Sequence, residues 1–137
     1  IDRFQVVNYT FGNALGDHVL QEVATRLQSS VRELDTVSRF GGDEFVILLE
    51  EIESYRMPIQ IMRRVQEALT QPFYVDNTSI QLTASIGMVL WTMDYRSAEE
   101  ILRNATIAMQ AARKKGTGKF RVFSPSLLTE AMSLMTL

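Results

Sequence analysis

The order of the predicted elements indicates an α+β domain of the ferredoxin-like kind, with an antiparallel sheet flanked by helices. Strand patterns follow one another directly at 37–40 and 44–49, and a second such pair lies at 73–75 and 80–83. Strands joined by so few residues pair antiparallel. Helical patterns separate these pairs, and their apolar residues recur at three- and four-residue spacing. Such helices can cover a sheet, so we favour this class over a doubly wound sheet.

The helices are predicted from apolar spacing and from signals at their ends. In chain order they are a short turn at 4–8, a long helix at about 15–34, a helix beginning near 54, a helix from 98 to about 114, and a tail from 125. Ser54 and Ser97 are the expected N-caps, and Pro58 fits a first turn. The residues expected to face inward are Val19, Leu20, Val23, Leu27, Val31, Leu34, Ile59, Met62, Val65, Leu69, Ile101, Leu102, Ala105, Ala108, Met109 and Ala112.

The strands are predicted from short apolar or alternating runs bounded by turn residues. In chain order they lie at 37–40, 44–49, 73–75, 80–83 with a continuation to about 90, and 119–123. Gly41-Gly42 separates the first pair and Asp76-Asn77 the second, and such residues accept the positive φ of tight hairpin turns.

Composition bounds the class of protein. The chain has 137 residues, 46% of them apolar, which suits one folded domain. The net charge of −2 gives no sign of a nucleic-acid or membrane surface, and we expect no nucleic-acid partner. The lack of cysteine and the single His18 exclude disulfides, zinc–thiolate sites and His-rich metal sites. No apolar run reaches membrane-spanning length, and both ends look cut. We therefore expect an excised, cytoplasmic domain whose parent protein can still be anchored in a membrane.

Residues 39–49, Arg-Phe-Gly-Gly-Asp-Glu-Phe-Val-Ile-Leu-Leu, carry the strongest chemical signal. Asp43 and Glu44 stand at the mouth of an apolar strand, beside Gly41 and Gly42. The glycines allow a phosphate to approach the main chain, and carboxylate oxygens suit Mg²⁺. The alternative is an ordinary hairpin whose acids keep a sheet edge soluble.

Asn8 and Asp17 form a second candidate site, nine residues apart around Gly12 and Gly16. The pairing edge of guanine presents N1–H and N2–H₂ donors beside an O6 acceptor. A carboxylate accepts from the donors, and a side-chain amide complements the rest. The alternative is local, with Asn8 in a turn and Asp17 at the start of the long helix.

These stretches resemble the GGDEF domains, whose active members make cyclic di-GMP from two GTP. Residues 41–45 match the signature of that family letter for letter, residues 2–20 look like its opening motif, and residues 105–117 resemble the motif of a later helix. The resemblance covers nearly the whole chain. It implies a palm-type ferredoxin-like fold, GTP as substrate, Mg²⁺ (or Mn²⁺) as cofactor, and a homodimer as the active form.

The resemblance also implies roles for individual residues. It assigns guanine contacts to Asn8 and Asp17, and both metal binding and catalysis to Asp43 and Glu44. The first metal-binding acid of the family falls one position before Ile1, whose backbone carbonyl would be the neighbouring ligand. The other implied substrate contacts are Phe4, through its backbone, Gly41, Gly42 and Arg113.

Arg32 and Asp35 precede the signature as an Arg-x-x-Asp motif. In the family, this motif at this place is the inhibitory site for the product, so cyclic di-GMP is an expected ligand. Arginine offers a planar fork to phosphate and guanine, and aspartate accepts from guanine. The alternative is an Arg–Asp pair that closes the end of a helix.

Departures from the family pattern leave two functions open. Gln5, Asn13 and Arg113 replace a lysine, a histidine and a lysine of the pattern. The departures that favour the second function are Tyr9, Thr106, Gln110 and Thr117, which replace an acid, an acid, a tyrosine and an arginine. One function is an active diguanylate cyclase. The other is a weak or non-catalytic module that binds GTP or cyclic di-GMP and regulates an EAL phosphodiesterase domain. We expect a GGDEF domain at 1–123 and a linker helix at 124–137, with sensory or EAL domains elsewhere in the parent chain.

Overall fold

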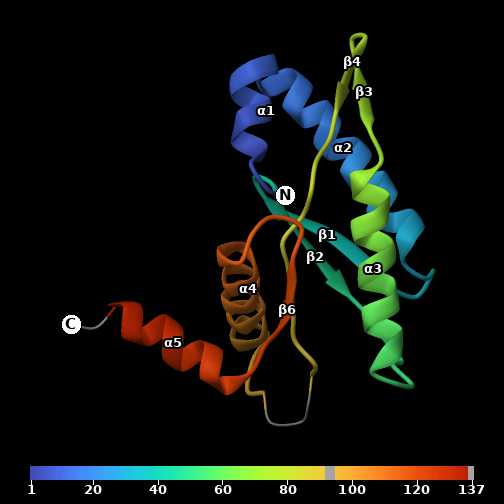
Figure 1. Cartoon of the computed structure of the whole chain (residues 1–137). Coiled ribbons are helices and arrows are strands. Elements are labelled where there is room, and N and C mark those ends of the chain that lie inside the picture. The colour runs from blue at the N-terminus through green and yellow to red at the C-terminus, as the bar shows by residue number, and fades with distance from the viewer. Residues whose placement is uncertain (92–94, 136–137) are drawn as a thin grey trace. The chain divides into compact units, whose positions relative to one another are not determined.

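The computed structural model describes residues 1–91 and 95–135 and divides the chain into two compact units, at 1–83 and 84–137 (Figure 1). The elements of the first unit are α1 (Phe4–Phe11), α2 (Asn13–Ser30), β1 (Thr36–Gly41), β2 (Glu44–Leu48), α3 (Arg56–Thr70), β3 (Phe73–Val75) and β4 (Thr78–Ile80). Those of the second unit are β5 (Ile86–Met88), α4 (Ala98–Lys114), β6 (Phe120–Val122) and α5 (Pro125–Met135). This mixture of helices and strands is the predicted α+β class.

Two antiparallel hairpins shape the first unit, as predicted, although the last strand of the second hairpin lies at 78–80 rather than at 80–83. β1 pairs with β2, and the register skips Phe40, which forms a bulge just before the Gly-Gly turn. β3 pairs with β4 through Asp76 and Asn77, whose φ angles are 43° and 66°. Two consecutive positive φ angles are typical of the two-residue turn that matches the twist of paired strands.

The core of the first unit lies between α2 and α3. Its most deeply buried side chains are Val19, Val23 and Leu27 of α2, Ile61, Val65 and Leu69 of α3, and Phe73 of β3. The predicted inward face of α3 is correct except at Ile59, which is half-buried, while Ile61 is buried in its place. The N-cap prediction for α3 is wrong, because Tyr55 rather than Ser54 precedes the helix and makes no side-chain cap bond.

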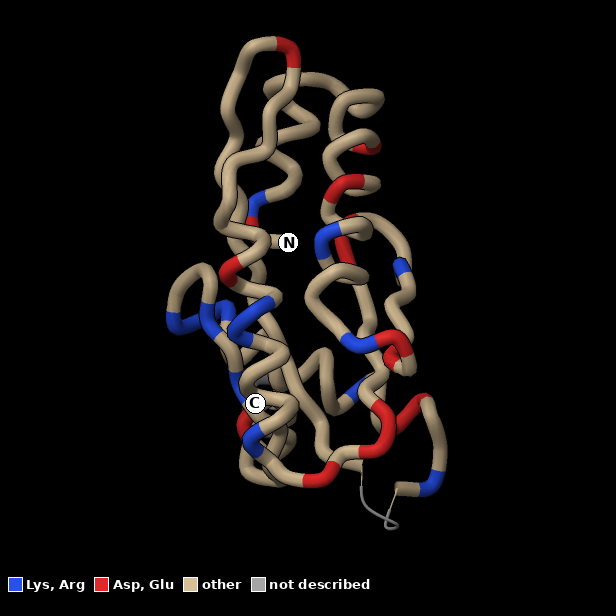
Figure 2. Tube along the Cα trace, turned by 90° about the vertical axis from the view of Figure 1, so that its right-hand side faces the viewer, with Lys and Arg blue, Asp and Glu red and all other residues tan. Residues whose placement is uncertain are grey.

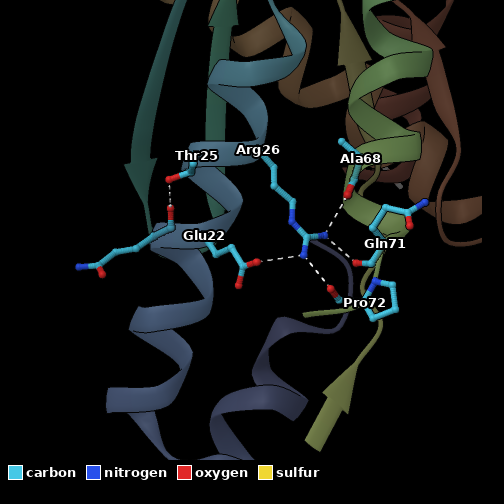
Figure 3. Close-up of polar contacts among 7 residues, drawn as sticks. Glu22, Thr25, Arg26, Ala68, Gln71 and Pro72 are labelled. Atoms are coloured by element: carbon cyan, nitrogen blue, oxygen red, sulfur yellow. Dashed lines mark hydrogen bonds and ion pairs between the residues drawn. The ribbon is translucent and has the colours of Figure 1, made fainter. Parts of the chain in front are cut away.

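Arg26 joins α2 to the end of α3 (Figure 3). Its guanidinium donates to the backbone carbonyls of Ala68, Gln71 and Pro72 at 2.9, 2.6 and 2.7 Å. Glu22, one turn earlier on α2, accepts from Arg26 at 3.0 Å, and the Phe73 ring lies under the guanidinium at 3.6 Å. The last carbonyls of a helix lack intrahelical partners, so Arg26 caps α3 from a neighbouring helix.

The second unit contains a parallel pair, which differs from the antiparallel expectation. β5 and β6 run parallel, with α4 in the connection between them. A parallel pair needs a long crossover, and the helix supplies it. Gly87 of β5 allows α4 to approach closely, because a Cβ there would lie 2.0 Å from the Ala105 carbonyl oxygen.

The helices of the second unit begin at residues that favour a helix start. Ser97 caps α4 as predicted, accepting from the N–H of Glu100 at 3.2 Å. α5 begins at Pro125, and its Leu127 is buried. The boundary at 123/124 stays a prediction, and residues 136–137 of the expected linker lie outside the described residues. Within the described ranges, no helix combines the length and the apolar character needed to cross a bilayer.

Candidate functional site

The turn at 41–44 presents two carboxylates beside open backbone. Gly41 and Gly42 have φ angles of 107° and 54°, and a Cβ added to either would meet no atom within 4 Å. Asp43 lies in the turn with a side chain 35% exposed, and Glu44 begins β2 and is exposed. Arg39 braces the turn, because its Nε donates to the Gly42 carbonyl at 2.9 Å. The hairpin therefore leaves room for a ligand at the main chain next to both acids.

The start of the chain lies against this turn. The nitrogen of Ile1 donates to the Asp43 carbonyl at 3.0 Å and lies 3.8 Å from Asp43 Oδ2. The structure thus brings Ile1 next to Asp43 through its nitrogen, and Glu44 is next in sequence, while the Ile1 carbonyl as a metal ligand stays a prediction. Asp2 is buried and faces elsewhere, since its carboxylate accepts from Thr83 Oγ1 at 2.8 Å.

The donor set of the hairpin fits a hard divalent cation. It offers two carboxylates and nearby backbone oxygens, and such oxygens are the ligands that Mg²⁺ prefers. Across residues 1–91 and 95–135, no three His, Cys, Asp or Glu side chains gather into a ready-made metal cluster. Two side-chain ligands therefore have to be supplemented by backbone, water or substrate phosphate oxygens, as is usual for Mg²⁺.

Asn8 and Asp17 come from consecutive helices. Asn8 lies in α1 and is half-buried, and Asp17 lies in α2 and is exposed. The Asn8 amide oxygen lies 1.9 Å from the place that a Cβ would take on Gly16, the residue before Asp17. The structure therefore brings the Asn8 amide against the backbone that carries Asp17. Phe4 is buried at the start of α1, so only its backbone N–H, in the first turn, is a candidate phosphate contact.

Arg32 and Asp35 bond to each other. Arg32 donates to the Asp35 carboxylate through Nε at 2.9 Å, through Nη2 at 2.7 Å and through its backbone N–H at 2.8 Å. The Arg32 guanidinium also donates to the Glu50 carbonyl, and the Glu50 N–H donates to Asp35 at 3.3 Å. This is the geometry of the alternative in which the pair closes the end of a helix. It also explains why α2 ends at Ser30 rather than near 34.

The Arg32–Asp35 contact shifts the pKa of both groups in the direction that favours their charged forms. The hydrogen bond from Arg32 lowers the pKa of the Asp35 carboxyl below its usual value, although burial opposes the shift. The same hydrogen bond raises the pKa of Arg32. A pocket of about 360 Å³ adjoins the pair, lined by Gln28, Val31, Arg32, Glu33, Asp35, Thr36 and Val37.

Arg113 belongs to the second unit, in the last turn of α4, and is exposed. Lys114, Lys115 and Lys119 follow it, and residues 101–129 contain no acidic residue. Figure 2 shows Lys and Arg recurring along this part of the chain. This stretch is a strongly basic helix end and turn, whose cations suit anionic groups.

Sequence reasoning missed three residues that shape these sites: Arg39, Gly16 and Thr83. Arg39 is part of the signature stretch, and its role as a brace becomes visible only in the turn geometry. Gly16 stands between apolar helical positions, where glycine is unfavourable, and this was a usable signal of close packing. Thr83 carries no signal, because it lies 81 positions from its partner Asp2.

Comparisons with known proteins agree with the signature. The family model described as "Diguanylate cyclase, GGDEF domain" matches residues 1–119. The bifunctional diguanylate cyclase/cyclic di-GMP phosphodiesterase MucR of Pseudomonas aeruginosa is 34% identical over 137 residues, which are 100% of this chain and 20% of that protein. Cyclic di-GMP phosphodiesterase NbdA of the same organism is 32% identical over 131 residues, 96% of this chain and 17% of that protein.

A solved structure extends the comparison to the fold. The X-ray structure of an EAL/GGDEF domain protein from M. capsulatus matches with a TM-score of 0.84 at 34% identity, and the match covers 91% of this chain and 81% of that chain. The predicted palm-type α+β fold is therefore confirmed. This chain spans about a fifth of the length of the two curated relatives. Since the family model covers most of its residues, the chain belongs to the GGDEF domain family of diguanylate cyclases.

Proposed function

We propose that the domain condenses two GTP into cyclic di-GMP, as a homodimer and with Mg²⁺ or Mn²⁺ at the signature hairpin. The observation that carries this proposal is the hairpin itself. Its Gly-Gly-Asp-Glu-Phe sequence is intact, and its glycines leave the backbone open on a turn braced by Arg39. Asp43 and Glu44 are both at least partly exposed there. A phosphate and a hard cation can therefore reach the same point.

In the proposed reaction the ribose 3′-oxygen of one GTP attacks the α-phosphorus of the other, and pyrophosphate leaves. A second attack with exchanged roles closes the ring. Because each nucleophile belongs to the other substrate, two protomers must present their GTP molecules to each other. Asn8 and Asp17 would hold the guanine, and Asp43, Glu44 and the Ile1 carbonyl would hold the cation. Mg²⁺, when bound, neutralises phosphate charge and lowers the pKa of the attacking hydroxyl.

The Arg32–Asp35 pair is the proposed inhibitory site for cyclic di-GMP. Support comes from the motif and from the pocket of about 360 Å³ beside it. Arg32 already donates hydrogen bonds to Asp35 and to the Glu50 carbonyl. Cyclic di-GMP would therefore have to replace some of these bonds with its own acceptors. An Arg32→Ala variant whose affinity for cyclic di-GMP equals that of the wild type would refute this assignment.

A regulatory module without turnover is the second candidate, and two observations favour it. NbdA is named as a phosphodiesterase alone. In α4, Thr106 stands where the family pattern has an acid, and its hydroxyl donates to the Leu102 carbonyl at 2.9 Å, inside its own helix. In this case the domain would bind GTP or cyclic di-GMP and control an EAL domain of the parent chain.

One assay separates the two candidates. The chain, and the parent protein with its residues upstream of Ile1, are incubated with GTP and Mg²⁺, and the products are separated by chromatography. Cyclic di-GMP that disappears in Glu44→Ala but persists in Glu67→Ala, an exposed acid on α3, supports the cyclase. GTP binding without product in both proteins excludes the cyclase and supports the module. Thermal unfolding of each variant checks that its fold is unchanged.

A further inference from the structure

Gly16 occupies a position where the backbone does not require glycine. It lies in the first turns of α2, and its N–H donates to the Gly12 carbonyl at 3.1 Å. Its φ lies outside the left-handed region, unlike that of Gly12 at 91°. Glycine is the least favourable residue after proline inside a helix. The reason for glycine here must therefore be space.

The space is filled by the side chain of Asn8. A Cβ on Gly16 would lie 1.9 Å from Asn8 Oδ1, 3.1 Å from Asn8 Cγ and 3.4 Å from Phe4 Cζ. No residue other than glycine can therefore stand here while Asn8 keeps its place. Phe4 is buried behind the amide, and the Asn8 backbone is fixed, since its carbonyl accepts from Gly12 at 2.9 Å.

In the structure the oxygen is the end of the Asn8 amide that faces Gly16. The oxygen is the nearest atom, and the nitrogen is not among the three nearest, so it lies farther away than 3.4 Å. The NH₂ group is thus the end left to donate to a ligand. Guanine carries the O6 acceptor at the position where adenine carries an amino donor.

We propose that Gly16 is a positioning residue for base recognition. It holds the Asn8 amide with its oxygen toward α2 and its NH₂ group toward the base, beside Asp17, and so determines how well the domain separates GTP from ATP. This proposal rests on the proposed guanine contacts of Asn8 and Asp17. The coupling between Gly16 and Asn8, on which the proposal depends, can be measured without any nucleotide.

The test is a double-mutant cycle of Gly16→Ala, Asn8→Ala and the double variant, measured by thermal unfolding and by affinity for GTP and for ATP. Gly16→Ala should lower the melting temperature in the presence of Asn8 and raise it in the Asn8→Ala background, where the space is free. Gly16→Ala should also reduce the GTP/ATP affinity ratio about tenfold or more, the equivalent of one lost hydrogen bond. In the Asn8→Ala background it should leave that ratio unchanged.

Each outcome decides one part of the proposal. A wild-type GTP/ATP ratio in Gly16→Ala overturns the positioning role. Additive melting temperatures overturn the coupling. Coupled melting temperatures with a ratio that neither single variant changes overturn Asn8 as a guanine contact, which is a failure of the proposed function and not of the packing. The double variant keeps the test valid if Gly16→Ala alone folds poorly, because there the methyl group meets no amide.

Discussion

Asp35→Asn removes the charge from a carboxylate that accepts hydrogen bonds on both oxygens. The Asp35 side chain has 0% exposure, and its oxygens accept four hydrogen bonds. Three of the bonds come from Arg32 and one from the N–H of Glu50, fifteen residues later. Asparagine keeps the shape of the side chain but directs an NH₂ group at other donors. The substitution should therefore destabilise the fold and leave the backbone N–H of Glu50 without its acceptor.

We expect Asp35→Asn to lower the free energy of unfolding by about 2–3 kcal/mol at neutral pH, since a bond to a charged group contributes roughly 1.5–3 kcal/mol and bonds within one network do not add. The Arg32 side chain is 28% exposed, and water around it weakens the pair. Adding four full bonds would therefore overestimate the loss.

The loss of stability caused by Asp35→Asn should depend on pH. The hydrogen bond from Arg32 lowers the pKa of Asp35 in the folded protein relative to the unfolded chain. A group with a depressed folded pKa stabilises the fold above its unfolded value, about 3.9 for aspartate, and this stabilisation is lost as the pH falls through the folded pKa. The difference between wild type and Asp35→Asn should thus be full at neutral pH and shrink below about pH 4.

The assay is urea unfolding of both proteins at several pH values, together with hydrogen exchange of the Glu50 amide. Glu33→Gln is the matched control, because it removes the same charge from an exposed acid two residues away and should change stability by less than about 0.5 kcal/mol. Equal stability of wild type and Asp35→Asn at neutral pH, or a difference that stays constant into the acid range, would refute the reasoning. So would unchanged exchange at Glu50.

Three further predictions follow from the same geometry. Arg26→Met should lower the free energy of unfolding by about 2–4 kcal/mol, because three carbonyls at the end of α3 lose their donor. Arg26→Lys should retain only part of that stability, and urea unfolding measures both variants. Asn8→Asp should weaken GTP binding more than Asn8→Ala does, since a carboxylate would face the O6 acceptor of guanine; titration calorimetry measures this, and equal affinities would contradict it. Glu44→Ala should abolish cyclic di-GMP formation without shifting the melting temperature by more than a degree or two, because the Glu44 side chain is exposed and its carboxylate makes no hydrogen bond among the described residues; chromatography of the products and thermal unfolding measure the two effects.

The elements that sequence predicted well are those whose causes are local. Asp76-Asn77 and Gly41-Gly42 specify their turns through positive φ, and Ser97 specifies a helix start through one hydrogen bond three residues on. α2 ends at Ser30, earlier than the predicted end at about 34, and the Arg32–Asp35 pair closes the chain just after it. The sequence indicates that pair as one of two alternatives, whereas its bonds to Glu50 join residues fifteen and eighteen positions apart, which no local pattern reports.

The same distinction applies to the sites. The Asp43–Glu44 hairpin is contiguous, so its chemistry was readable from the sequence. The contact of Ile1 with Asp43 spans 42 positions, and the parallel pairing of β5 with β6 spans a whole helix. Gly16 is intermediate. Its cost in helix propensity was visible, but its partner Asn8 depends on how α1 folds back on α2.

Departures from the family pattern occur in both units. Gln5, Tyr9 and Asn13 lie in α1 and at the start of α2, and Thr106, Gln110, Arg113 and Thr117 lie in α4 and the turn after it. The residues proposed to read guanine and hold the cation all lie in the first unit and are intact. Base recognition is proposed for Asn8 and Asp17 and turnover for Asp43 and Glu44, so the two can be lost separately even within the first unit. Selective GTP binding by a chain that forms no product would place the defect outside the base contacts, whereas loss of selectivity would place it at Asn8, Gly16 and Asp17.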